Sequence, residues 1–401
     1  MQMIKRVTSF EITAAERALP GVSALIGREL SLLLQRMFRL AMLLCLFTIG
    51  ESQSLELERA PATQTMAGME RVVSKASQRV SQWDGPVSGP AGKAGMSVAV
   101  ICEDLRNGGV LGVARGIGEA ADVMGWRIRL FDAHGTRVGR TSSLEAAFDM
   151  QPDGVILLGS DADSLEPGLS SFAKREIPLV GWHVGPEAGK LTAGSVAMNV
   201  STDPMEVARV TAMAAIVESQ GKAGVVIFRD DNFAIAMRKA KVMQQVIQAC
   251  QGCQLLEMRT VAISQSAELM PSETRELLIK YGDRWTHALA INDIYFDYAA
   301  PELTKAGRVV HLYSAGDGSP SAFLRIQAGT FQYGTVAEPL NLQGWQLVDE
   351  LNRLLSGWEV SGYVMPVHLV TPDNIGFDGG PRMLFDPDNG YREVYRRIWK
   401  R

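Results

Sequence analysis

The feature that most constrains the fold is a regular alternation of short apolar runs and amphipathic stretches, which begins at Ser97. The runs are rich in β-branched residues and almost continuously apolar, which is typical of strands buried on both faces of a parallel sheet. They occupy residues 97–101, 126–131, 154–159, 177–182, 224–228, 254–258, 287–291 and 309–313. Helices are expected between them, among others at 110–124, 204–218, 232–250 and 299–306. This order predicts an α/β fold with helices on both faces of parallel sheets.

The strand pattern indicates two similar lobes rather than one large sheet, because it restarts at Gly224 after a long helix that begins near Pro204. In open α/β sheets, ligands bind at the carboxyl ends of the strands. Candidate site residues are therefore expected directly after the strands, in the segments 103–109, 159–164, 182–183, 229–232, 292–293 and 314–319.

Composition excludes several classes of protein. The net charge of −4, from 40 basic and 44 acidic residues, disfavours a nucleic-acid-binding protein, since these are normally basic. Hydrophobic residues make up 46% and charged residues 21%, which excludes disorder throughout the chain. A single apolar stretch excludes a protein with many membrane spans. Four cysteines are too few for a disulfide framework.

The N-terminal part is predicted to direct export. Residues 40–50 form an uncharged apolar run with arginines before it and small or polar residues after it, which is typical of a secretory signal peptide. The run is too short to span a bilayer, which needs about 20 residues. We therefore interpret residues 1–52 as a signal-peptide region. Such a signal would start at Met37, which makes residues 1–36 an upstream mis-start.

Motifs for catalysis and cofactor binding are weak or absent. Residues 107–116 open a helix after the first strand, but their glycines do not have the G-x-G-x-x-G spacing. The chain has no phosphate-binding G-x-x-x-x-G-K-[ST] and no G-x-S-x-G nucleophile motif. The five histidines are scattered, and His287 and His311 are interpreted as core residues of apolar strands. No enzymatic activity, no cofactor and no metal site are expected.

Two cysteines stand close together at the end of a predicted helix, Cys250 and Cys253. A redox-active C-x-x-C normally opens a helix, where the thiol pKa is lowered. Here the pair ends a helix and precedes a strand. In an exported protein, a small structural disulfide is therefore favoured over a redox site.

Aromatic and polar side chains after the strands remain as candidates for binding. Trp182 ends a strand beside His183, and an aromatic ring can stack on the apolar face of a sugar. The alternative is that Trp182 fills the edge of a core. Asn292, Asp293 and Asp317 can donate or accept hydrogen bonds. Each alone could cap a helix, whereas together they predict a polar cleft.

Several segments, in this order, resemble a known family. SVAVICEDLRNGGVLGVARGIGEAADVMGWRIRLFD, PDGVILLGSDAD and ALAINDIYFDYAAPEL are similar to the sugar-type, ribose-binding-like periplasmic binding proteins of ABC importers, which have the type I fold. The resemblance covers about 97–371. It implies two Rossmann-like lobes with parallel sheets, joined by a three-strand hinge that closes around the ligand. It also implies a periplasmic location and a membrane permease as partner.

The resemblance implies boundaries for the lobes as well. The chain would cross between them near Ser201, Glu338 and Val370. Lobe one would comprise residues 97–201 and 339–369, and lobe two residues 202–338 together with the tail 370–401. Residues 53–96 would form an N-terminal extension.

The family's ligand-binding positions can be transferred to this chain. Asn107 takes the position of the Asn after the first strand, and Asn292 and Asp293 those of an Asn-Asp pair. Asp317 corresponds to a late Asp, Glu338 to a Gln near the hinge, and Arg238, within one residue, to an Arg of lobe two. The predicted ligand-binding set is Asn107, Trp182, His183, Arg238, Asn292, Asp293, Asp317 and Glu338.

Two departures from the family pattern change the expected ligand. Gly109 and Val110 stand where ribose-type binders have two aromatics, and Trp182-His183 stands where they have an Asp-Arg pair. Ribose and the common hexoses are therefore disfavoured. A different sugar, a polyol or another small polyhydroxylated molecule is expected, bound by a monomer for import. The alternative is a sensor subunit of the same fold that presents its ligand to a signalling receptor.

Overall fold

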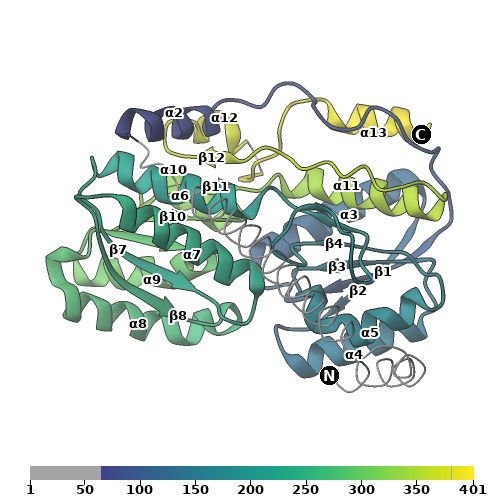
Figure 1. The fold of residues 1–401 in the computed structure, drawn as a ribbon, viewed down its shortest axis with the longest axis horizontal. Coiled ribbons are helices and arrows are strands. Elements are labelled where there is room, and N and C mark those ends of the chain that lie inside the picture. Colours follow the sequence, from purple (N-terminus) through teal and green to yellow (C-terminus); the bar gives the residue numbers. More distant parts are fainter. Residues whose placement is uncertain (1–64, 381) are drawn as a thin grey trace, which may run out of the picture. The chain divides into compact units, whose positions relative to one another are not determined.

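Two six-stranded sheets covered by helices organise the protein in a computed structural model, which describes residues 65–401 except Pro381 (Figure 1). The predicted signal-peptide region, 1–52, lies outside the described residues, as does the start of the predicted extension at 53–96. None of the described helices is long and apolar enough to cross a membrane. The predicted α/β fold of two lobes with largely parallel sheets is confirmed.

The sheet of lobe one has the strand order β2-β1-β3-β4-β6-β5. Neighbouring strands are parallel except for β5 and β6. The central strands are buried on both faces, because separate apolar clusters cover the two sides of the sheet. The strands are β1 (Ser97–Cys102), β2 (Arg127–Asp132), β3 (Gly154–Leu158), β4 (Leu179–Trp182), β5 (Gly189–Lys190) and β6 (Met198–Val200).

The sheet of lobe two has the order β12-β11-β10-β9-β7-β8, and here only β11 and β12 are antiparallel among the paired strands. Strands β11 and β12 were not among the predicted runs, and neither were β5 and β6 of lobe one. Strands β5, β6 and β12 have only two or three residues, too few to show a period. The strands are β7 (Gly224–Arg229), β8 (Gln254–Thr260), β9 (His287–Ala290), β10 (His311–Ser314), β11 (Gln332–Ala337) and β12 (His368–Val370).

Helices connect the parallel strands, and polar side chains start several of them. Asn107, Asp161 and Asp203 accept backbone N–H groups at the first turns of α3, α5 and α6. The helices are α2 (Met66–Ala76), α3 (Gly108–Met124), α4 (Arg137–Asp149), α5 (Ala162–Ala173), α6 (Pro204–Glu218), α7 (Ala234–Ala249), α8 (Ser266–Tyr281), α9 (Ile294–Ala306), α10 (Pro320–Gln327), α11 (Leu340–Leu355), α12 (Ile375–Asp378) and α13 (Tyr391–Trp399).

Three crossings of the chain connect the lobes. The first lies between β6 and α6, the second between β11 and α11, and the third directly before β12. Thr202 of the first crossing forms a β-bridge with Met365 of the third. Its amide and hydroxyl donate hydrogen bonds of 3.3 and 2.6 Å to Glu338 of the second. The crossings are therefore joined to one another, as a hinge requires.

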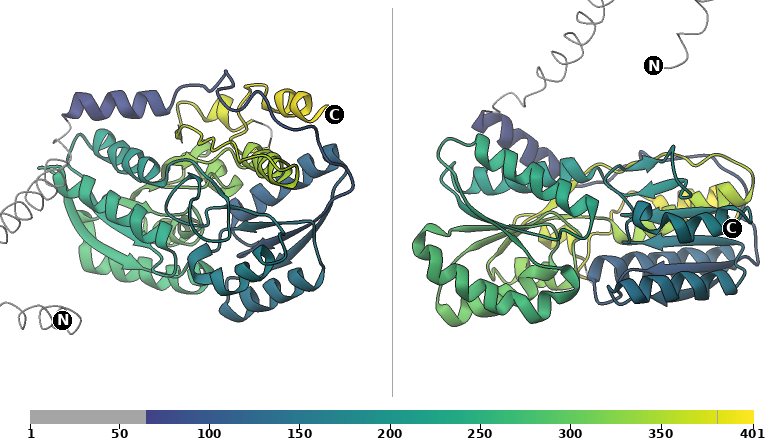
Figure 2. Two further views of the ribbon diagram at one scale, coloured as in Figure 1. Left: turned by 45° about the vertical axis from the view of Figure 1, so that its right-hand side comes forward. Right: turned by 60° about the horizontal axis from the view of Figure 1, so that its bottom comes forward.

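The predicted lobe boundaries need two corrections. Strand β12 pairs with β11 in the sheet of lobe two, so the third crossing precedes His368 and the range 339–369 is too long for lobe one. Helix α13 packs on α11 in the core of lobe one, so assigning all of 370–401 to lobe two is wrong (Figures 1 and 2). The cause is the aromatic face of α13, whose Trp399 stacks on Trp345.

A candidate ligand-binding cleft

A cavity of about 280 Å³ lies between the two lobes, at the carboxyl ends of their strands. Its volume is near the lower end of the range for small-molecule sites, roughly 300–1,000 Å³. Both lobes contribute polar lining residues, among them Glu103, Asn107 and Arg140 from lobe one and Asp230, Lys239 and Asn292 from lobe two. A small polar molecule bound there would contact both lobes at once.

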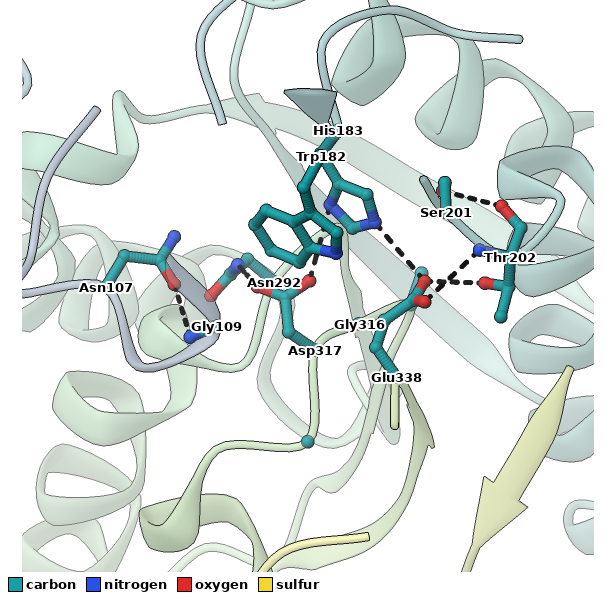
Figure 3. Close-up of polar contacts among 12 residues, drawn as sticks. Asn107, Gly109, Trp182, His183, Ser201, Thr202, Asn292, Gly316, Asp317 and Glu338 are labelled. Carbon is teal, nitrogen blue, oxygen red and sulfur yellow. Dashed lines mark hydrogen bonds and ion pairs between the residues drawn. The ribbon is translucent and has the colours of Figure 1, made fainter. Parts of the chain in front are cut away.

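Five of the eight predicted binding residues line the cavity, namely Asn107, Trp182, His183, Asn292 and Asp317. The Oδ1 atom of Asn107 accepts the N–H of Gly109 at 2.9 Å, which begins α3 (Figure 3). This cap uses only the oxygen, so the amide nitrogen remains to donate to a ligand. Asn292 donates its Nδ2 to Oδ2 of Asp317 at 2.7 Å.

Trp182 serves partly as a core residue and partly as a wall of the cavity. It is 1% exposed, and its Nε1 donates to Oε1 of Gln343 at 2.8 Å. The His183 ring stacks on the indole with ring centroids 3.8 Å apart and an interplanar angle of 9° (Figure 3). One face of the indole is therefore covered by His183. The half-buried Phe233 lines the cavity from lobe two and offers a second aromatic surface.

His183 of lobe one lies close to two carboxylates, those of Asp317 and Glu338. It follows β4 of lobe one with a φ of 51°, a backbone region in which residues other than glycine are uncommon. Its Nε2 lies 3.3 Å from Oε1 of Glu338, and its Nδ1 lies 4.0 Å from Oδ1 of Asp317 (Figure 3). Both carboxylates belong to lobe two or the hinge, so this imidazole links the lobes at the back of the cavity.

Burial acts to raise the pKa of both carboxylates near His183, but their neighbours leave the two pKa values shifted in opposite directions. Burial raises the pKa of Asp317 above its ordinary range, and the nearby positive charges of His183 and Lys239 offset this only in part. Burial would also raise the pKa of Glu338. The nearby imidazole of His183, the charge of Lys239 and the Thr202 hydroxyl together lower that pKa to about 2. Glu338 is therefore the ionised partner of His183.

Glu338 does not line the cavity but lies behind His183 in the hinge. It accepts hydrogen bonds from Thr202 and from the Gln343 amide. All these contacts are within the protein. The carboxylate predicted to bind ligand thus lies between the hinge and His183 rather than in the cavity lining.

Asp293 also lies outside the cavity lining. Its carboxylate accepts hydrogen bonds from the amide of Gly318 at 2.8 Å, from the Gln332 amide at 2.8 Å and from the Thr335 hydroxyl at 3.2 Å. Burial is the main reason that the pKa of Asp293 is raised, to about 6. The side chain holds the loop that carries Asp317 and is a positioning residue rather than a contact residue.

The predicted lobe-two cation is Lys239 rather than Arg238, within the one-residue uncertainty of the prediction. Arg238 lies on the surface and pairs with Glu187 of lobe one at 3.1 Å. Lys239 is 3% exposed, lines the cavity and donates from Nζ to the Ala315 carbonyl at 2.7 Å. Adjacent residues of a helix point about 100° apart, so one of the two faces the cavity and the other faces solvent.

Glu103, Arg140 and Phe233 line the cavity but were not in the predicted ligand-binding set. Glu103 accepts hydrogen bonds from Arg140 and from the Ser160 hydroxyl. The Arg140 guanidinium lies 5.8 Å from the ring centre of Phe233, across the cavity in lobe two. Glu103 and Ser160 fall within the segments flagged after strands. Phe233 directly follows the flagged segment 229–232 and is an aromatic that could stack on a ligand, whereas Arg140 carried no signal because it lies inside helix α4.

A contact between the lobes also caps the first turn of α7. Phe233 offers no side-chain cap there. Instead, the amide of Ala234 donates to Oδ2 of Asp161 in lobe one at 3.2 Å, while Oδ1 of the same carboxylate caps α5. A single carboxylate thus joins helix starts from both lobes, beside the cavity.

The two cysteines predicted to pair are bonded in the structure, where Cys250 and Cys253 form a disulfide. They lie between α7 and β8, at the amino end of the sheet and therefore away from the cavity. Cys102 is a free, buried cysteine.

Comparisons with known proteins were made against families, curated proteins and solved structures. A family model described as "Periplasmic binding protein domain" matches residues 98–359. No curated protein matches the chain.

Among the similar solved structures is an ABC sugar transporter subunit from Rhodobacter sphaeroides, with a TM-score of 0.61 and 20% identity, covering 70% of this chain and 99% of that chain. A solute-binding protein from Agrobacterium vitis with bound allitol has a TM-score of 0.62 and 18% identity, covering 70% and 97%. One from Bacillus halodurans with bound myo-inositol has a TM-score of 0.60 and 17% identity, covering 71% and 98%.

At these identities the solved structures establish the fold alone, whereas the family model covers well over half of the chain. The family model describes a binding-protein domain, in agreement with the prediction that the chain is not an enzyme. With two lobes, a hinge of three crossings and a cavity between the lobes, the chain belongs to the periplasmic binding protein domain family.

Proposed function

We propose that this protein is a periplasmic receptor that captures a sugar, a polyol or a similar small polyhydroxylated molecule and delivers it to the permease of an ABC importer. The observation that carries the proposal is the cavity between the lobes, where hydrogen-bonding groups of both lobes face one small volume. The bound allitol and myo-inositol of the neighbours support the same ligand class.

The lining suits a ligand rich in hydroxyl groups. Asn107 and Lys239 can donate hydrogen bonds, Asp317 can accept them, and the Phe233 ring can cover an apolar face. A hydroxyl both donates and accepts, so it can be satisfied by either kind of group. Ligand contacts with both lobes would favour the closed form, which is the form that a permease can distinguish from the open one.

The first experiment is a thermal-shift screen of the full chain against sugars, polyols, amino acids and nucleosides. A ligand at about 100 times its dissociation constant adds about 2.7 kcal/mol to stability. A hit among polyhydroxylated compounds supports the proposal. Hits only among amino acids or nucleosides would overturn the ligand class.

A matched pair of variants tests the site itself. Lys239→Met removes the buried cation, and Lys241→Met removes an exposed cation of the same helix. Losing a hydrogen bond to a charged group costs about 1.5–3 kcal/mol, or roughly 10-fold or more in affinity. Lys239→Met should show this loss in calorimetric titration and Lys241→Met should not. Equal effects would contradict the proposed site.

The delivery step needs a cellular measurement. Deleting the gene should reduce uptake of the identified ligand, and the Lys239→Met variant should fail to restore it. Normal uptake in the deletion strain, with a lost growth or transcription response to the ligand, would contradict an importer role.

A further inference from the structure

A second group of polar side chains lies at the opposite end of the lobe-two sheet from the cavity. His287 and His311 are the first residues of β9 and β10, and they are paired in register. Residues in register on parallel neighbouring strands project from the same face. That face is covered by α6, whose last residue is Glu218 (Figure 1). The topology thus places two imidazoles under one carboxylate.

The three side chains are in direct contact. Nε2 of His287 lies 2.7 Å from one carboxylate oxygen of Glu218, and Nδ1 of His311 lies 2.9 Å from the other. Each residue offers one ligand atom, and these atoms all lie within 4.8 Å of one another. His287 is buried, while the side chains of His311 and Glu218 are 25% and 30% exposed.

We propose that Glu218, His287 and His311 form a binding site for a divalent transition-metal ion, with Zn²⁺ as the best-matched ion. Two imidazole nitrogens and one carboxylate oxygen are a ligand set that zinc takes in proteins, with water in the fourth position. Zinc–nitrogen distances of about 2.0–2.1 Å place tetrahedral ligand atoms about 3.3 Å apart. The two nitrogen–oxygen separations, 2.7 and 2.9 Å, would have to widen by about half an ångström, and the part-exposed Glu218 side chain can move.

The surroundings of the two imidazoles favour ligation. Nδ1 of His287 lies 2.8 Å from the hydroxyl of Thr286, which also accepts the amide of Gly224 at 2.9 Å. The His311 ring stacks on Tyr333 with centroids 3.9 Å apart. Partners on the second ring nitrogen and stacking contacts hold metal-binding histidines in orientation.

Proton transfers required by metal binding can occur within the site. A neutral His287 that gives its Nε2 to the metal carries its proton on Nδ1, where the Thr286 oxygen accepts it. His311 can likewise carry its proton on Nε2.

The site is also reachable from solvent. An open groove between α2, α6 and the β10–β11 side of the sheet is lined by Glu218, Tyr313 and Tyr333. Neither histidine lines this groove, but the side chains of His311 and Glu218 are 25% and 30% exposed, so a metal ion and a water molecule can reach them from solvent.

The test is a Zn²⁺ titration of the metal-stripped full chain, without a histidine tag, in competition with a chromophoric chelator. We expect one Zn²⁺ per chain, and roughly 10-fold or greater weakening in Glu218→Gln and in His311→Gln. His134→Gln is the matched control, because His134 lies in lobe one and pairs with Asp132. No stoichiometric binding, or equal affinity in the Glu218 and His311 variants, would overturn the proposal.

A second measurement separates ligation from a folding defect. X-ray absorption of the zinc-loaded protein should show two imidazoles and further oxygen ligands, and a spectrum without imidazole would overturn the proposal. Glu218→Gln preserves shape at a part-exposed position, so circular dichroism should show an unchanged fold. Because the ligand cavity lies at the other end of the sheet, this result is independent of whether a sugar binds.

Discussion

Glu338 is a buried carboxylate whose charge is held by groups from both lobes. Its pKa is lowered from an ordinary value of 4.5 to about 2, although burial by itself would raise it. A carboxyl with a depressed pKa in the folded state stabilises the protein above its unfolded pKa, and this contribution is lost as the pH falls. The loss from Glu338 should therefore occur between about pH 4.5 and pH 2.

The variant Glu338→Gln tests this account. At pH 7 it removes the negative charge that accepts hydrogen bonds from Thr202 and Gln343, and weakening these bonds should cost about 1.5–3 kcal/mol of unfolding free energy. Between pH 4.5 and 2 its stability should fall less steeply than that of the wild type. Chemical denaturation at a series of pH values measures both effects. Glu359→Gln, which removes an exposed partner of Lys190, should change little. Parallel pH profiles for wild type and Glu338→Gln would contradict the assignment.

Helix α7 depends on lobe one for its first turn, because Asp161 accepts the Ala234 amide across the cleft. In Asp161→Asn, the remaining oxygen can still cap α5, but the new NH₂ group faces the Ala234 N–H. Loss of such a cap costs about 1 kcal/mol, which corresponds to about fivefold weaker ligand binding if it acts on the closed form alone. Stopped-flow measurements should show faster release and little change in association. An unchanged release rate would contradict this role, and the exposed Asp163→Asn is the control.

Helix α13 contributes to the core of lobe one, although it is the last element of the chain. Trp399 stacks on Trp345, and its Nε1 donates to the buried Asp349 at 2.7 Å. Trp399→Ala should lower the unfolding free energy by about 3–5 kcal/mol, as large aromatic truncations in cores do. The dissociation constant for ligand should not change, because α13 does not line the cavity. Phe377→Ala, at a half-exposed side chain, is the control for thermal denaturation; equal losses would contradict the packing role.

The described part of the protein is expected to be a monomer. Its exposed large apolar side chains are spread over many elements, among them Val138 on α4, Ile279 on α8 and Phe377 on α12. A stable dimer normally needs a continuous apolar surface. Light scattering at micromolar concentration should therefore give the mass of one chain. A mass of two chains, independent of dilution, would contradict the expectation.

Most of the two-lobe fold could be predicted because continuous apolar runs and helical periodicity are local properties. The helix predicted at 204–218 is reproduced with the same ends, whereas the three-residue strands β6 and β12 are too short to show a period. Within the site, Asn107, Asn292 and Asp317 could be placed because they directly follow strands or begin helices. Such positions all lie at one edge of a parallel sheet.

The sequence by itself determined the alternation of strands and helices, the restart of that pattern in a second lobe, and the polar strand ends from which the cavity is built. Only the tertiary structure decided that Lys239 rather than Arg238 faces the cavity and that Glu338 lies beside His183, outside the cavity lining. It also decided that α13 packs on lobe one. The physical reason is the distance along the chain over which each kind of interaction acts. Periodicity and capping act over a few neighbouring residues, whereas these contacts join segments far apart in the chain, and only the closely packed fold selects them.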